Sequence, residues 1–265
     1  MLLKKGSSKV RKSSKVDNGI VALVKSVGSL MGPEIAINVK METWQLVKWD
    51  GSSGTWKEHD QEINTWCPSK FLIMCLNTIQ NGVQVEMPLF ASSWGLEFWN
   101  SYANGSDLVD VDDDANDGGC KRVEKIAWVL SAAADKISMK EKEGVSFDGP
   151  FLLYIVPSQE KTYEVSQICK FLEVVGIQTL ALHSGASIEH QIHSLKSYEP
   201  EFVVSTPERL LELLSLKAVN LSDVSLMIVD GLEDPLDDTT YLNALQSIRQ
   251  SITGNPQTVV FCNSK

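Results

Sequence analysis

Short apolar runs alternate with amphipathic segments through the second half of the chain. Residues 151–156 form a continuous apolar run after Asp148-Gly149-Pro150, which predicts a buried strand. In 159–175 the apolar residues recur at intervals of three or four, which places them on one face of a helix. Gly176 then predicts the end of that helix.

The same alternation continues to the C-terminal end of the sequence. It predicts strands at 177–182, 201–205, 224–229 and 257–262, and helices at 188–197, 207–214 and 238–250. Strands that alternate with helices indicate an α/β fold with a parallel sheet and helices on both faces. Ligands of such sheets bind at the carboxyl ends of the strands, so we expect the functional residues at that edge.

The first third of the chain has no such pattern. The first fifteen residues hold six Lys/Arg and no acid, and we expect 1–40 to be a basic, disordered segment. A nuclear-localisation or RNA-contacting arm is the alternative. Residues 41–85 form a Trp-rich extension of unknown fold, with a predicted hairpin at 49–56 and a short helix at 70–80. Its tryptophans either line a small binding module or pack on the main domain.

Composition narrows the class of protein. With 43% hydrophobic residues the chain can bury a core, and its net charge of −10 is unusual for a nucleic-acid binder. The five cysteines include no CxxC pair, which gives a zinc site little support and suggests a reducing compartment, the nucleus or the cytoplasm. The apolar stretch 19–37 is broken by Lys25, Pro33 and Glu34, so no membrane segment is predicted.

Five short motifs lie at or near the ends of the predicted strands. In order they are Pro157-Ser158-Gln159-Glu160, His183-Ser184-Gly185, Thr206-Pro207-Glu208-Arg209-Leu210-Leu211, Ile228-Val229-Asp230-Gly231-Leu232-Glu233 and Thr258-Val259-Val260-Phe261-Cys262-Asn263-Ser264. They resemble the PTRE, GG, TPGRLL, DEAD and SAT motifs of DEAD-box RNA helicases. From about residue 86 onward, the chain therefore resembles the first RecA-like lobe of that family, a P-loop NTPase fold.

The resemblance implies a phosphate-binding loop after Gly105-Ser106-Asp107-Leu108-Val109, which is similar to the GRDL segment of the family. A P-loop requires a Lys for the phosphates and a Ser/Thr for Mg²⁺. We place this Lys-Thr pair on Gly118 and Gly119, so both side chains are lost. The vestigial loop then consists of Asp112, Asp114, Asp117, Gly118 and Gly119, whose carboxylates repel a triphosphate.

The catalytic motif also departs from the family pattern. Asp230 keeps the position that organises Mg²⁺, whereas Gly231 stands where the family has its catalytic Glu, and Glu233 lies at the last position of the motif. The adenine-reading Gln, expected near Phe90, is absent. We therefore expect no catalytic residue and no cofactor.

The family holds the RNA backbone with residues that here correspond to Ser158, Gln159, Gly185, Thr206 and Arg209. The Arg of PTRE is Gln159 and the Gly of TPGR is Glu208, so one cation is lost and one anion is gained. The alternative is that Glu160 and Arg209 pair with each other and hold two loops together.

Metal binding has weaker support. Asp110, Asp112 and Asp114 have the 1-3-5 spacing of an EF-hand loop, but Ala115 and Lys121 stand where that loop has its Gly and Glu. His183, His190 and His193 lack a carboxylate or Cys that would complete a site, and we expect an exposed helix there.

Three functions remain open. The first is a helicase-derived module without ATPase activity that acts as a scaffold in RNA processing or RNA silencing, binding RNA weakly through its phosphates or binding proteins. The second is a fragment of an ATP-dependent RNA helicase that needs a second lobe, with ATP and Mg²⁺ as cofactors. The third is a protein-interaction domain with no role in nucleic-acid binding. No membrane partner is expected.

Overall fold

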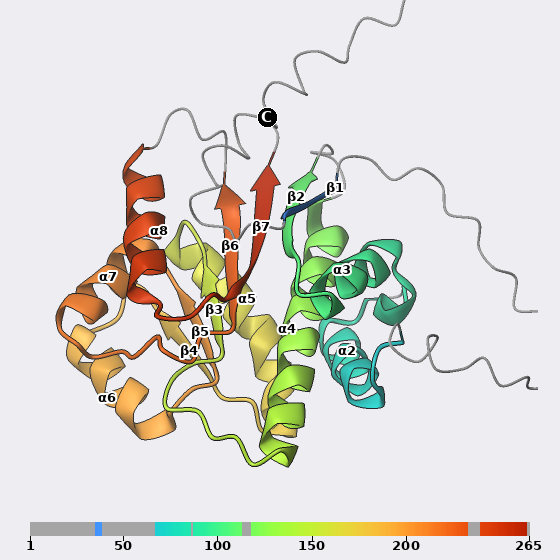
Figure 1. The fold of residues 1–265 in the computed structure, drawn as a ribbon, viewed down its shortest axis with the longest axis horizontal. Helices are drawn as coiled ribbons and strands as arrows, with labels where there is room; N and C mark the ends of the chain where they lie inside the picture. The colour runs from blue at the N-terminus through green and yellow to red at the C-terminus, as the bar shows by residue number, and fades with distance from the viewer. Residues whose placement is uncertain (1–34, 39–66, 86, 113–117, 233–238, 264–265) are drawn as a thin grey trace, which may run out of the picture.

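The computed structural model describes residues 35–38, 67–85, 87–112, 118–232 and 239–263. Seven strands form one sheet in the order β1-β2-β7-β6-β3-β5-β4, and every neighbouring pair is parallel. Helices cover both faces of this sheet (Figure 1). The predicted fold class, one RecA-like lobe built on a parallel sheet, is confirmed.

The strands are β1 (Ile35–Asn38), β2 (Asp107–Asp112), β3 (Leu152–Ile155), β4 (Thr179–Leu182), β5 (Phe202–Ser205), β6 (Leu226–Leu232) and β7 (Gln257–Asn263). The helices are α2 (Lys70–Val83), α3 (Ser93–Ala103), α4 (Gly118–Lys142), α5 (Gln159–Cys169), α6 (Ile188–Tyr198), α7 (Pro207–Ser215) and α8 (Thr239–Ser251). Two 3₁₀ segments, η2 (Leu89–Ala91) and η3 (Lys170–Val175), complete the described elements.

The five strands predicted after residue 150 are present, within two residues at most boundaries, as are the helices between them. The helix expected at 159–175 changes to 3₁₀ geometry at Lys170 and stops at Gly176, whose φ is +93°. The predicted hairpin at 49–56 lies outside the described residues. Ile35–Asn38, within the segment expected to be disordered, instead forms the edge strand beside β2.

Alternate residues of the inner strands enter two separate cores. Leu152 and Tyr154 of β3 belong to the core under α2, α3, α4 and α5, whereas Leu153 and Ile155 belong to the core under α6, α7 and α8. Because successive side chains of a strand point to opposite faces, a strand buried on both sides must be apolar at every position. This explains the continuous apolar runs of the sequence.

Helix α4 is the longest element and crosses the whole face of the sheet (Figure 1). Trp128, in its middle, is fully buried, and its Nε1 donates to Leu89 O at 2.8 Å. Gly95 of α3 lies directly against the Trp128 ring, where a β-carbon would come within 1.8 Å of Nε1. Helix α2, which lies in the Trp-rich extension defined from the sequence, packs against α4 and contributes Leu72 and Leu76 to the same core.

No helix of the described residues combines the length and the apolar character needed to cross a membrane. The beginning of α4 lies near the carboxyl ends of β2 and β6, and its other end lies near their amino ends (Figure 1). Residues near the start of α4 therefore reach the edge where ligands of such sheets bind.

Candidate nucleotide and RNA edge

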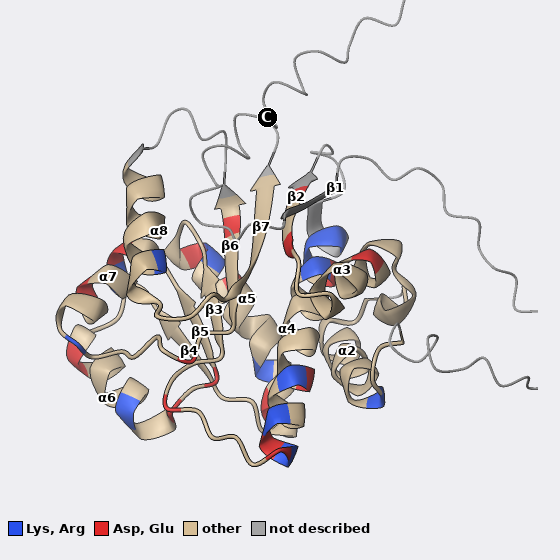
Figure 2. Cartoon of the chain, in the orientation of Figure 1, with Lys and Arg blue, Asp and Glu red and all other residues tan. Residues whose placement is uncertain are grey.

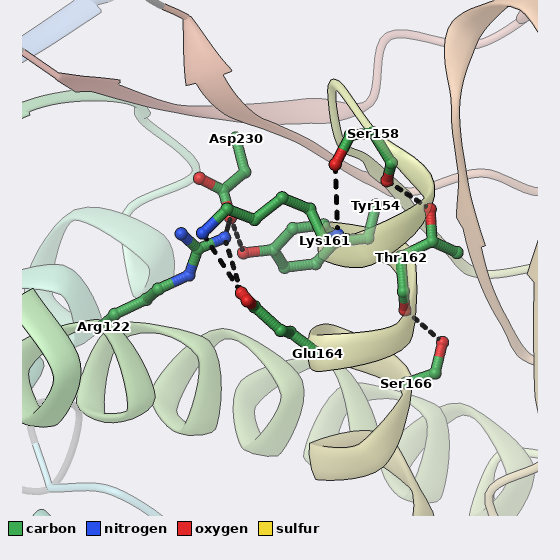
Figure 3. A network of polar contacts seen from close by, with 8 residues as sticks. All are labelled: Arg122, Tyr154, Ser158, Lys161, Thr162, Glu164, Ser166 and Asp230. Carbon is green, nitrogen blue, oxygen red and sulfur yellow. Dashed lines mark hydrogen bonds and ion pairs between the residues drawn. The ribbon is translucent and has the colours of Figure 1, made fainter.

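Asp230 lies near the carboxyl end of β6 and is only 6% exposed. Arg122 Nη2, from α4, lies 3.0 Å from Asp230 Oδ2, and the Tyr154 hydroxyl donates to the same oxygen at 3.1 Å (Figure 3). Burial raises the pKa of Asp230, and the Arg122 charge and the Tyr154 hydrogen bond oppose that rise. The chain thus supplies a cation and a hydroxyl to this buried carboxylate.

One glutamate and one lysine of α5, Glu164 and Lys161, lie beside this contact. Glu164 Oε2 lies 3.8 Å from Arg122 Nη2 and 3.1 Å from Lys161 Nζ (Figure 3). Arg122 therefore bridges a buried carboxylate on the sheet and an exposed one on α5. The result is a charge network in which both carboxylates have cationic partners from the chain.

A second ion pair links α4 to the sheet at the same edge. Lys125 Nζ contacts Asp110 Oδ2, and both side chains are almost completely buried. The ammonium also lies 5.9 Å from the ring centroids of Trp94 and Phe261, within range for cation–π attraction. Arg122 and Lys125 are three residues apart and so share a face of α4, from which they bind β6 and β2 (Figure 2 colours these residues by charge).

These contacts change the interpretation of the acidic stretch. Asp110 and Asp112 belong to β2, so the loop is shorter than the sequence suggested. Since Asp110 is paired with Lys125, it is not free to start a calcium loop. Asp114 and Asp117 lie outside the described residues, and the described residues contain no cluster of three metal-binding side chains.

Gly231 stands next to Asp230, where the catalytic Glu of the family was expected. Its φ is +79°, and it forms part of a register shift between β6 and β7. A β-carbon there would also lie 3.0 Å from Pro157 Cγ. This backbone conformation favours glycine, and a larger residue at this position would be strained. Glu233 lies outside the described residues.

A model of the DEAD/DEAH box helicase family matches residues 126–263, more than half of the 265 residues. The chain belongs to this family. It is 28% identical over 210 residues to DEAD-box ATP-dependent RNA helicase 45 of Oryza sativa subsp. japonica, covering 77% of this chain and 21% of that protein. It is 33% identical over 110 residues to DEAD-box ATP-dependent RNA helicase CshA of Streptococcus pneumoniae, covering 41% of this chain and 21% of that protein.

The fold has a counterpart among solved structures. A crystal structure of a hypothetical ATP-dependent RNA helicase from Sulfolobus tokodaii superposes with a TM-score of 0.51 at 18% identity, over 71% of this chain and 50% of that one. The chain spans about a fifth of the length of the rice and pneumococcal relatives. It therefore matches one part of these helicases.

Family membership gives the Arg122–Asp230 contact a chemical meaning. In P-loop NTPases a Ser/Thr that follows the P-loop Lys shares Mg²⁺ with the Asp of the DEAD-type motif. The residue that reaches Asp230 from the start of the helix here is Arg122, preceded by Lys121. We infer that Lys121 and Arg122, not Gly118 and Gly119, occupy the Lys-Thr positions. The placement on Gly118 and Gly119 stays a prediction, and this contact favours a placement three residues later.

The predicted RNA residues lie at the carboxyl ends of β3, β4 and β5, which are neighbours in the sheet. Gln159 covers Gly185, because a β-carbon on that glycine would lie 2.3 Å from Gln159 Oε1. Ser158 caps α5 by accepting from Lys161 N at 3.3 Å. The structure thus brings these three residues together. The Ser158 hydroxyl is used as a helix cap, and the Gln159 side chain lies against Gly185.

Arg209 has a different environment from the one the sequence suggested. Its side chain is 8% exposed; Nη1 lies 3.3 Å from Glu212 Oε2, and Nη2 donates to Ala186 O at 3.3 Å. The expected partner, Glu160, is not in this ion pair; its pKa is lowered by its own backbone N–H and the Ser158 hydroxyl. Thr206, which is 7% exposed, begins α7 beside it. Arg209 therefore joins α7 to the loop after β4, and its contact with RNA stays a prediction.

Exposed acidic residues lie along this edge of the sheet. Glu160, Glu189 and Glu208 are exposed in the first turns of α5, α6 and α7. Carboxylates at these helix ends are stabilised by the helix dipole, but they repel a phosphate backbone. His190 and His193 lie exposed on α6, as the sequence predicted.

Sequence reasoning missed Arg122, Lys125 and Tyr154. The available signal was the pair Lys121-Arg122 just before the long apolar segment of α4, since P-loops place their Lys-Ser/Thr pair where the helix begins. Tyr154 was read only as part of an apolar run, although a buried tyrosine usually has a partner for its hydroxyl.

Proposed function

We propose that the chain is a DEAD-box-derived module that does not hydrolyse ATP and serves as a protein-binding scaffold in RNA metabolism. The observation that carries the proposal is the contact between Arg122 and Asp230. The Arg122 guanidinium lies 3.0 Å from the carboxylate that would bind Mg²⁺. It therefore places a positive charge where the metal ion would have to bind. With Gly231 beside it, the motif also lacks the carboxylate that would position an attacking water.

A protein partner is favoured over RNA by the charges at the strand ends. Three exposed glutamates face solvent at the starts of α5, α6 and α7, while Arg209 is buried and already bonded. Non-specific RNA affinity comes mainly from cations that neutralise phosphates. The described part of this edge offers few such cations, so RNA binding through it would be weak and strongly salt-dependent.

An enzyme fragment is the second candidate. It is supported by the relatives, whose names describe ATP-dependent RNA helicases, and by the short share of their length that this chain spans. Lys121 is retained in the loop position and could contact phosphates. On this interpretation, a second lobe would complete the catalytic site.

Titration of the intact chain with ATP and Mg²⁺, with and without single-stranded RNA, separates the two candidates, because a fragment that needs a second lobe would bind ATP without turning it over. We expect no binding and no turnover above a protein-free blank. The variant Arg122→Thr restores the hydroxyl and frees Asp230, and we expect it to gain Mg²⁺-dependent nucleotide binding without hydrolysis, because Gly231 remains. Arg249→Thr is the matched control, since Arg249 bonds only to the loop after α8. RNA-stimulated turnover by the unmodified chain would overturn the proposal.

Binding of RNA is tested separately by filter binding at low and moderate salt. Weak binding that disappears with added salt fits the scaffold proposal. Tight binding that persists at moderate salt would favour the helicase-fragment candidate.

A further inference from the structure

A cavity of about 480 Å³ lies at the edge of the sheet opposite Asp230. Gly105, Phe151 and Ser225 line it, and each directly precedes a strand or lies within two residues of its start. The C-terminal half of α4 and the end of α3 form the other walls. The cavity is therefore separate from the nucleotide edge, and its size suits a small organic molecule.

A buried carboxylate lies in this cavity. Asp135 of α4 is 4% exposed, and Ser69 Oγ donates to its Oδ1 at 2.5 Å. It forms no ion pair with any described residue. Buried carboxylates are normally paired with a cation or satisfied by several donors, because removing the charge from water is costly. Asp135 is thus ready to accept further N–H groups.

The walls near Asp135 are aromatic. Trp99 and Tyr102 of α3 line the cavity with their ring centroids 6.0 Å apart. The Trp99 Nε1–H is buried and has no acceptor among the described residues. A flat ligand would gain apolar contact against these two rings.

Two lysines complete the lining. Lys136 and Lys140 lie one turn apart on α4, and Lys140 Nζ lies 5.4 Å from the Phe151 ring centroid. Together with Asp135 they give the lining a net positive charge. A simple organic cation would be drawn to Asp135 but repelled by both lysines. A ligand with N–H donors at one end and an anionic group at the other satisfies all three side chains.

We propose that this cavity binds a guanine nucleotide, with the base against Asp135 and the phosphate at Lys136 and Lys140. Guanine presents adjacent N1–H and N2–H donors to a carboxylate, whereas adenine offers an amino group beside an acceptor. Base stacking on aromatic side chains is a common source of nucleotide affinity. The site is distinct from the family's nucleotide edge, and the proposal does not depend on the absence of ATP hydrolysis.

Calorimetric titration of the intact chain with guanosine, inosine and adenosine monophosphates tests the proposal without any mutation. We expect guanosine monophosphate to bind about tenfold more tightly than the inosine compound, which lacks the N2 donor, since a hydrogen bond to a charged group is worth about a decade of affinity. Equal affinities for the three, or no heat with guanosine monophosphate, would overturn it.

A variant locates the site. Asp135→Asn keeps the shape of the side chain but replaces an acceptor by a donor, and we expect it to remove the preference for guanine. Glu208→Gln is the matched control, since it removes one carboxylate at the opposite edge. If Asp135→Asn binds guanosine monophosphate as the unmodified chain does, the ligand lies elsewhere and the proposal fails. Should the variant unfold, the three-nucleotide comparison still decides.

Discussion

Arg122 and Asp230 are 108 residues apart in the sequence and meet at 3.0 Å near the carboxyl end of β6. The pair is joined by Tyr154 and is mostly shielded from solvent. Because one partner is a fixed guanidinium, the charge of Asp230 is balanced whether or not a nucleotide is present. The ion pair therefore offsets part of the cost of burying the Asp230 charge, and its removal should be measurable.

Arg122→Ala should lower the free energy of unfolding by about 1–3 kcal/mol. Breaking a buried pair leaves an uncompensated charge, but the 28% exposure of Arg122 lets water screen part of the loss. Chemical denaturation at neutral pH measures the change. Arg122→Ala combined with Asp230→Asn should recover most of the lost stability, and equal losses in the single and double variants would contradict this account.

The penalty of Arg122→Ala should shrink in acid. Burial raises the pKa of Asp230 above its ordinary 3.8, and removing the Arg122 charge raises it further. A carboxyl whose folded pKa is raised destabilises the fold when ionised, and this cost disappears as pH falls through the folded pKa. Denaturation of both chains from neutral pH down toward pH 4 checks the trend. A difference that grows in acid would contradict it.

Gly231→Glu restores the family's residue but should not restore catalysis. A non-glycine residue at a φ of +79° costs about 1–2 kcal/mol, and the close contact with Pro157 adds to that cost. We expect a lower melting temperature and no ATP turnover. Gly254→Glu is the control, because a β-carbon there meets no atom within 4 Å. Equal melting temperatures of the two variants would show that the glycine conformation is not required.

Arg209→Ala should clearly lower the stability of the fold but change the affinity for RNA little. The guanidinium is buried and joins Glu212 to Ala186 O, so its loss should cost about 1–3 kcal/mol. Circular-dichroism melting gives the stability, and filter binding gives the RNA affinity. A normal melting temperature with strongly reduced RNA affinity would show that Arg209 acts on RNA directly.

The sequence predicted the sheet well because its inner strands are buried on both faces. That burial requires continuous apolar runs such as 151–156, and these runs are visible in the sequence. Strand β2 was not predicted, because Asp107, Asp110 and Asp112 interrupt its apolar residues. In the structure Asp107 accepts from Thr258 N at 2.7 Å and Asp110 pairs with Lys125. Such partners, distant in sequence, leave no local pattern.

The candidate site was only partly predictable for the same reason. The positions of Asp230 and Gly231 followed from motif order alone. The register of the phosphate-binding loop did not, because the acidic stretch after Leu108 gives no clear landmark, and the contact of Arg122 with Asp230 was not visible in the sequence. Burial of Arg209 likewise depends on how α7 packs against the loop after β4.

The most direct test of the central claim is a calorimetric titration of the intact chain with Mg²⁺-ATP, performed with and without single-stranded RNA. If Arg122 holds the place of the metal ion, no binding should be detected at about millimolar ATP, and Arg122→Thr should bind more tightly than the unmodified chain. A dissociation constant below about 100 µM for the unmodified chain, dependent on Mg²⁺, would contradict the account.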